Sequence, residues 1–257
     1  MEPRTAEKFV AALKELDAEM KKDIKAGHQW RYTNVKKRNK TFAAARKQKN
    51  YVTNCATGVD WGLTLAGVPS KAQAWYGSDG CIAWVGQNAE KNARKYFEII
   101  KIPTNAGKNR TVKGLYDSGQ LCEGDILVYH GMNHTNAYIG GGKSFDSGHA
   151  YCSGSGEMAP FKKWVGALAH KTAKVAYILR LKDRIHYRVQ VGAYTTDKGL
   201  QNRTRQLDKL KIDWIIKNED GYKKLQLKHV FSSKEQAEKY IVALRDKHKI
   251  VGILKEE

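Results

Sequence analysis

The chain has 257 residues, of which 41% are hydrophobic and 28% are charged, a composition that supports a buried core and is not typical of a disordered protein. It carries 46 Lys and Arg against 26 Asp and Glu, a net charge of +20, and the excess is spread over residues 1–50, 51–185 and 186–257. This charge indicates a polyanionic partner: nucleic acid, an anionic membrane surface or an anionic cell-wall polymer. No segment approaches the roughly 20 apolar residues that span a bilayer, so we expect no membrane insertion.

The first 50 residues are predicted to be a helical segment. Apolar residues recur at three- and four-residue steps between residues 5 and 26, and Gly27 can end this helix. A second, strongly basic segment covers residues 36–49. Because charged residues follow Met1 where a secretion signal would have its apolar core, we expect no signal peptide and a protein made in the cytosol.

A third helix is predicted from Asn54 to Ala66. Asn54 is a favourable N-cap residue, and the helix pattern stops at a Gly and a Pro. The pattern from residue 71 to residue 120 is mixed, with a helix predicted near 88–97 and loops near 104–114.

Strand patterns follow in the next part of the chain. They cover residues 125–130, 134–139 and 175–181. Gly140 to Gly142 predict a turn that folds residues 143–147 back beside the second of these strands. Helices first and antiparallel strands after them indicate an α+β fold for a domain of residues 1–184.

The four cysteines are widely spaced and lack the Cys-x-x-Cys or Cys/His spacing of a zinc site. They are Cys55, Cys81, Cys122 and Cys152. Without a secretion signal a disulfide framework is not expected, so we predict no metal and no cofactor. Cys55 differs from the others because it stands in the first turn of the helix that Asn54 caps, where the helix dipole favours the thiolate.

A cysteine nucleophile needs a base within hydrogen-bond reach and a third group that orients the base. His134 opens the second predicted strand, and the glycine turn would place Asp146 next to it. His149 is the alternative third group, and Asp146 is favoured on spacing. The sequence therefore predicts a Cys55, His134 and Asp146 site.

Two features of this site are less well defined by the sequence. The backbone N–H of Cys55 is one candidate donor to an oxyanion, and Tyr51 is another. The remaining histidines, His170 among them, have no partner that the sequence reveals.

The segment from Gly124 to Lys143, GDILVYHGMNHTNAYIGGGK, resembles the strand–turn–strand signature of NlpC-type cell-wall cysteine peptidases, papain-fold enzymes related to the CHAP amidases. Those enzymes carry a cysteine at a helix start, this histidine, and a polar residue about 12 positions beyond it, as here. The resemblance covers roughly residues 50–180 and implies a papain-like catalytic domain with Cys55, His134 and Asp146 as its catalytic residues. The sequence reads Asn-Cys-Ala-Thr where the family usually has Asp-Cys-Ser-Gly.

Residues 185–257 contain an internal repeat with an offset of 36 positions. Residues 187–191 and 223–227 are both period-two strands, and each is followed by a helix pattern and a short strand. The order β-α-β-β-α-β predicts a small ferredoxin-like domain. We expect its helices to cover one face of the sheet and to leave the other face open.

Residues 187–194, Tyr-Arg-Val-Gln-Val-Gly-Ala-Tyr, are similar to the opening of SPOR domains, which bind the glycan strands of peptidoglycan. The resemblance covers about residues 186–255 and implies that bacterial peptidoglycan is the partner of the open face. The residues predicted to bind glycan are Arg188, Gln190, Tyr194, Lys224, Gln226 and Lys228.

Together the two resemblances indicate a bacteriophage endolysin. Such a peptidoglycan hydrolase would cleave a peptide or amide bond of the stem peptide, accumulate in the host cytoplasm and reach the wall by a holin-type route. Anionic wall polymers are a further expected partner.

An RNA-binding protein is the alternative, because β-α-β-β-α-β is also the order of an RRM and the charge of +20 suits phosphate. RRMs place aromatic residues on their central strands, whereas Lys224, Gln226 and Lys228 stand on the second repeat strand. The hydrolase is therefore favoured, and a nucleic acid partner is not expected.

Overall fold

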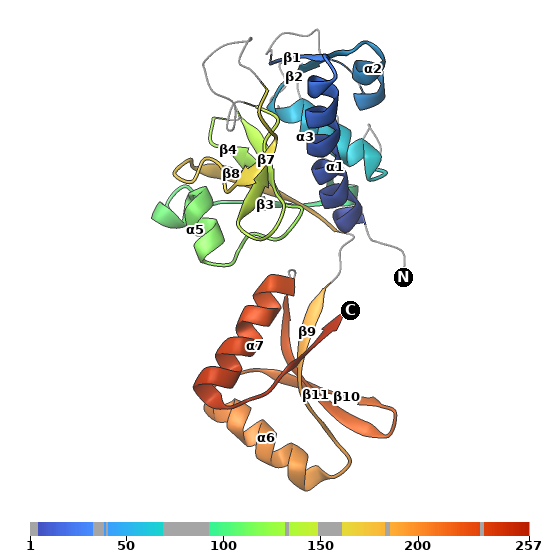
Figure 1. The fold of residues 1–257 in the computed structure, drawn as a ribbon. Helices are drawn as coiled ribbons and strands as arrows, with labels where there is room; N and C mark the ends of the chain where they lie inside the picture. Colours follow the sequence, from blue (N-terminus) through green and yellow to red (C-terminus); the bar gives the residue numbers. More distant parts are fainter. Residues whose placement is uncertain are drawn as a thin grey trace. The chain divides into compact units, whose positions relative to one another are not determined.

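A computed structural model describes residues 5–32, 39, 41–68, 93–131, 134–148, 161–182, 186–231 and 234–256. The chain divides into two compact units, residues 1–184 and 185–257, drawn in blue to yellow and in orange to red in Figure 1. Each unit has hydrophobic clusters of its own. Among the described residues, no helix combines the length and the apolar character needed to cross a membrane.

The helices of the first unit agree with the sequence pattern where that pattern is long. They are α1 (Thr5–Lys25), α2 (Phe42–Lys47), α3 (Cys55–Leu65), the 3-10 helix η2 (Gly107–Arg110) and α5 (Val112–Asp117). The predictions for residues 5–26 and 54–66 are confirmed by α1 and α3. In the basic segment 36–49 the described helix covers only α2, since most of residues 33–40 lie outside the described part.

A six-stranded antiparallel sheet forms the centre of the first unit, with the strand order β3-β8-β4-β5-β6-β7. Its strands are β3 (Phe97–Lys101), β4 (Ile126–Tyr129), β5 (Thr135–Tyr138), β6 (Lys143–Phe145), β7 (Val165–Ala167) and β8 (Val175–Leu181). The three predicted strands correspond to β4, β5 and β8. Two further strands, β1 (Gln29–Tyr32) and β2 (Asn50–Thr53), pair in parallel.

The helix predicted near 88–97 is confirmed where the structure describes it, since residues 93–96 are helical and β3 begins only at Phe97. The prediction of loops near 104–114 is wrong. The loops predicted near 104–114 hold η2 and the start of α5, which Thr111 caps through its side chain. Local capping decides the structure there, and it is not visible in the hydrophobic pattern.

Helices α1 and α3 pack against each other and cover one face of the sheet, while α5 packs in a separate cluster on the other face (Figure 1). The contact between α1 and α3 is close at Gly62, because a Cβ there would lie 2.5 Å from a methyl carbon of Leu13. Helix α3 also contacts β5. The start of α3 is thereby held against the part of the sheet that carries His134 and Asp146.

The second unit has the predicted order of elements. It consists of β9 (Tyr187–Tyr194), α6 (Asp197–Lys209), β10 (Trp214–Glu219), β11 (Tyr222–Phe231), α7 (Lys234–His248) and β12 (Ile253–Glu256). The four strands form an antiparallel sheet in the order β10-β11-β9-β12, and α6 and α7 pack on one of its faces. The two repeat strands, β9 and β11, are neighbours at the centre of this sheet.

Candidate functional site

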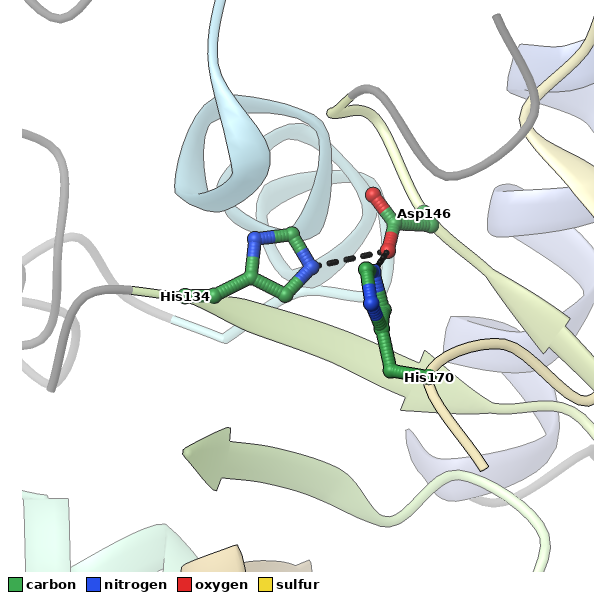
Figure 2. A group of neighbouring side chains, drawn as sticks. All are labelled: His134, Asp146 and His170. Carbon is green, nitrogen blue, oxygen red and sulfur yellow. Dashed lines mark hydrogen bonds and ion pairs between the residues drawn. The ribbon is translucent and has the colours of Figure 1, made fainter. Parts of the chain in front are cut away.

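His134 and Asp146 lie next to each other because of the turn between β5 and β6. His134 directly precedes β5 and Asp146 directly follows β6, and the strands pair Ala137 with Phe145. Gly140, Gly141 and Gly142 form the turn with φ angles of 82°, 57° and 66°, which favour glycine. His134 Nε2 lies 2.8 Å from Asp146 Oδ2 (Figure 2). The predicted juxtaposition is confirmed, whereas the catalytic role of the two residues stays a prediction.

A second histidine, which the sequence did not reveal as a partner, binds the same carboxylate. His170 Nε2 lies 3.0 Å from Asp146 Oδ2, and the two imidazole rings meet edge to face with centroids 4.5 Å apart (Figure 2). His170 follows β7 in a left-handed conformation with a φ of 49°. It comes near Asp146 because β7 pairs with β6, and β7 is too short to be recognised from sequence. His149, the alternative third group, lies outside the described residues.

The Asp146 carboxylate is fully buried and accepts three N–H groups. Its Oδ2 faces both histidines, and its Oδ1 accepts the backbone N–H of Gly148 at 2.8 Å. Burial by itself would raise the pKa of Asp146, but attraction and hydrogen bonds from His134 and His170 outweigh it and lower that pKa well below the ordinary value. Asp146 is therefore ionised at neutral pH.

The ionised carboxylate determines which nitrogen of His134 carries the proton. A carboxylate only accepts hydrogen bonds, so the Nε2 atoms that face it must be N–H donors. In neutral His134 the lone pair is then on Nδ1, the nitrogen that points away from Asp146 in Figure 2. This is the tautomer that a general base requires.

Cys55 is the first residue of α3 and is buried. The predicted cap is confirmed: Asn54 Oδ1 accepts the backbone N–H groups of Ala56 at 3.1 Å and Thr57 at 3.0 Å. Thr57 Oγ1 accepts the Asn54 N–H in return and completes a capping box. The thiol thus lies at the positive end of a well-capped helix, a position that favours the thiolate.

Ser147, which the sequence analysis did not single out, connects the Asp146 segment to the start of α3. Its Oγ lies 2.8 Å from the carbonyl oxygen of Asn54 and 3.0 Å from that of Cys55, and it accepts the Gly58 N–H at 3.2 Å. A Cβ at Gly58 would lie 2.5 Å from Ser147, so only glycine permits this approach. The residue after Asp146 therefore contacts the backbone of Cys55.

Tyr51 does not serve as the second candidate oxyanion donor. Its ring is buried, and its hydroxyl donates a short hydrogen bond to Asp23 of α1. Burial first, and then the Asp23 carboxylate, raise the pKa of this hydroxyl well above its ordinary value. The interpretation of Tyr51 is wrong because its hydroxyl is turned to Asp23 of α1, a contact between distant segments that the sequence does not reveal.

In the second unit, the predicted glycan-binding residues include two neighbouring glutamines. Gln190 and Gln226 are paired across β9 and β11, and the same row of the sheet continues to Ile253 on β12 and Ile215 on β10. We expected exposed amides, but Gln190 is 7% and Gln226 4% exposed, since neighbouring side chains cover them. Within the described residues neither Oε1 has a hydrogen-bond partner.

The charged residues of this face already have local partners. Arg188 Nη1 donates to the carbonyl oxygens of Leu227 at 3.1 Å and Lys228 at 2.9 Å, where β11 bulges. Lys224 Nζ lies 2.9 Å from carboxylate oxygens of Glu219 and Asp220. Lys228 itself is exposed.

Tyr194 lies apart from these residues. A bulge at Val191 shifts the register, so that Gly192 pairs with the core residue Leu225. The Tyr194 ring lies directly over Gly192 and against Gly199 of α6, where it packs on the hydrophobic cluster under the helices. Strict alternation along the strand would place Tyr194 on the open face with Arg188 and Gln190. The bulge at Val191 turns Tyr194 to the helix side, so the prediction that it belongs to the open face is wrong.

Comparison with known proteins identifies the second unit. Residues 183–255 match the family model of the SPOR domain, so this part of the chain is a SPOR domain. A solved structure that it resembles is the solution structure of the peptidoglycan binding domain of the B. subtilis cell wall lytic enzyme CwlC. The match has 23% identity and a TM-score of 0.27, and it covers 30% of this chain and 96% of that one. No curated protein sequence matches the chain.

Proposed function

We propose that the chain is a peptidoglycan hydrolase of the endolysin type, in which Cys55, His134 and Asp146 cleave a peptide or amide bond of the stem peptide. The SPOR domain would bind the wall, with peptidoglycan glycan strands as the main partner and anionic wall polymers as a further one. The NlpC-type catalytic domain, the phage origin and the holin-dependent route from the host cytoplasm belong to this proposal.

The observation that carries the proposal is the hydrogen bond between the partly exposed His134 and the buried Asp146, beside the start of a capped helix that begins with cysteine. These are the three groups that thiol hydrolysis needs: a nucleophile, a base and an orienting carboxylate. The SPOR domain supplies a reason for such a site to act on the cell wall.

In the proposed reaction, His134 Nδ1 takes the proton of the Cys55 thiol, and the thiolate attacks the carbonyl carbon of the scissile bond. The tetrahedral intermediate collapses when His134 gives the proton to the leaving amine, which produces an acyl thioester. His134 then takes a proton from water, which attacks the thioester and regenerates the thiol. Asp146 accepts the Nε2–H of His134 throughout and stabilises the imidazolium.

The test is wall lysis by the full chain and by two serine variants. Cys55→Ser should lose activity on purified cell walls by at least about a thousand-fold, because the nucleophile is removed. Cys122→Ser is the matched control, since Cys122 is also a buried cysteine, and it should keep most of the activity. Retained lysis in Cys55→Ser, or loss in Cys81→Ser or Cys152→Ser instead, would show that Cys55 is not the nucleophile.

An RNA-binding function is less well supported by the sheet of the second unit. The faces of β9 and β11 opposite the helices carry Arg188, Gln190, Lys224 and Gln226, and Tyr194 is turned toward α6. Around Gln190 and Gln226 the two central strands, which the structure describes in full, offer no aromatic side chain for base stacking on this face, and the exposed Tyr222 stands only at the start of β11.

A further inference from the structure

Three donor groups of the candidate site are close enough to share one metal ion. His134, Asp146 and His170 each offer a ligand atom, and these atoms all lie within 4.8 Å of one another. Two imidazole nitrogens and one carboxylate oxygen are a ligand set that Zn²⁺ accepts, commonly with a fourth position left to water. The sequence did not predict this metal site, because its three ligands come from separate segments and do not form a Cys/His motif with regular spacing.

The geometry fits zinc after a small adjustment. Zinc–ligand distances of about 2.0–2.1 Å in a tetrahedron correspond to ligand separations of about 3.3 Å. The present nitrogen–oxygen distances are 2.8 Å and 3.0 Å, so each ring must move away from Asp146 by less than one ångström, and the two histidine ligand atoms already lie within 4.8 Å of each other. The His170 and His134 side chains are 34% and 19% exposed and have room to move, whereas Gly148 N–H fixes Asp146 through the other oxygen.

An ion can reach this site from a cavity of about 390 Å³ that both histidines line. Tyr129 and His130 line it as well, and the ammonium group of Lys174 is the cationic group at its wall. The ammonium group disfavours a cation, but the buried negative charge of Asp146, 2.8 Å and 3.0 Å from the two histidine nitrogens, favours one.

We propose that His134, Asp146 and His170 form a Zn²⁺ site whose occupation inhibits the hydrolase. Zinc needs the Nε2 lone pair of each histidine, so each neutral imidazole carries its single proton on Nδ1 instead, with no net release of protons. His134 then lacks the Nδ1 lone pair that would deprotonate Cys55. The inhibition rests on the function proposed above, whereas zinc binding does not.

The first experiment measures binding alone. The full chain, stripped of metal with a chelator, is titrated with ZnCl₂ by calorimetry. His134→Gln and His170→Gln should each raise the zinc dissociation constant by at least about ten-fold. His130→Gln is the matched control, because His130 lines the same cavity but does not belong to the ligand set, and it should leave the constant unchanged. Circular dichroism of each variant establishes that it is folded.

A second experiment measures wall lysis at increasing ZnCl₂, with half-inhibition expected near the dissociation constant from calorimetry. Wild-type affinity in His170→Gln would overturn the site, as would binding that is lost in Cys55→Ser and kept in His170→Gln. A rate that rises with zinc would overturn the inhibitory role. If no variant or condition gives lysis, the proposed function fails, while the calorimetric result on the zinc site still stands.

Discussion

Asp146 shows how burial and charge combine at a single residue. A buried carboxylate is normally destabilised, yet three N–H donors surround this one and lower its pKa. Because the folded-state pKa is below the unfolded value of about 3.9, the ionised group stabilises the fold at pH values above that value. This contribution is lost progressively as the pH falls below about 5 toward the folded-state pKa.

The first prediction at this scale concerns Asp146→Asn. At pH 7 the substitution should lower the free energy of unfolding by about 2–4 kcal/mol, because charge-assisted hydrogen bonds are replaced and partner donors stay buried. Between about pH 5 and pH 3 the difference from the wild type should narrow, since the wild type loses its own stabilisation there. Urea unfolding at several pH values measures both effects.

Asp117→Asn is the control, because Asp117 is exposed and its ion pair within the described residues is with the exposed Lys113. It should change the unfolding free energy by less than about 0.5 kcal/mol. Parallel pH profiles for the wild type and Asp146→Asn would show that the Asp146 carboxylate does not contribute in this way.

At the scale of elements, the contact between α3 and the segment that follows β6 depends on the Ser147 hydroxyl. Ser147→Ala removes the acceptor of the buried Gly58 N–H and leaves two carbonyl groups with one partner fewer. We expect a loss of about 1–3 kcal/mol in unfolding free energy, together with lower activity because Cys55 is positioned less firmly. Urea unfolding and wall lysis measure the two effects.

Ser118→Ala is the matched control for this substitution. Ser118 also donates to a backbone carbonyl, that of Leu115, but it lies in an exposed turn, so the effect should stay below about 0.5 kcal/mol. Equal stability of the two variants would mean that the Ser147 contact does not hold the elements together.

The sequence predicted those helices and strands whose own residues show a hydrophobic or capping pattern. Helices α1 and α3 have a long apolar face or a strong cap, and β8 is apolar except for Arg180, so local residues suffice. Strand β7 has only three residues, and β3 directly follows a helical stretch at residues 93–96; the two strands pair with β6 and β8, which no local pattern encodes. The bulge at Val191 likewise depends on the neighbouring strand, and it moved Tyr194 to the other face.

The candidate site divides in the same way. His134 and Asp146 are joined by one tight turn, so their spacing in the sequence was enough to predict their contact. His170 is 24 residues from Asp146 and depends on the pairing of β7, and Ser147 contacts a helix that begins 92 residues earlier. Such contacts need the tertiary fold.

At the scale of the whole molecule, the two units have separate cores, and the SPOR domain keeps all of its hydrophobic cluster within residues 187–254. Catalysis and wall binding should therefore be separable by substitutions that leave each core intact. If anionic wall polymers are a partner as proposed, the net charge of +20 would add a general attraction, which salt screens over about 8 Å at physiological ionic strength. Binding that survives high salt should depend on hydrogen bonds instead.

The last prediction uses the two buried glutamines of the SPOR sheet. Their Oε1 atoms have no partner within the described residues, so sugar hydroxyl groups can supply the missing donors once side chains around them move. In a co-sedimentation assay at high salt, the full chain with Gln190→Ala and Gln226→Ala should bind purified peptidoglycan with a dissociation constant at least about ten-fold higher than the wild type. A ten-fold change corresponds to a loss of about 1.4 kcal/mol in binding free energy. Its cleavage of soluble muropeptides should stay at the wild-type rate. Gln201→Ala, on the exposed surface of α6, is the control and should bind walls normally. Unchanged wall binding in the double variant, or tighter binding of the wild type to single-stranded RNA than to peptidoglycan, would contradict the proposed role of this face.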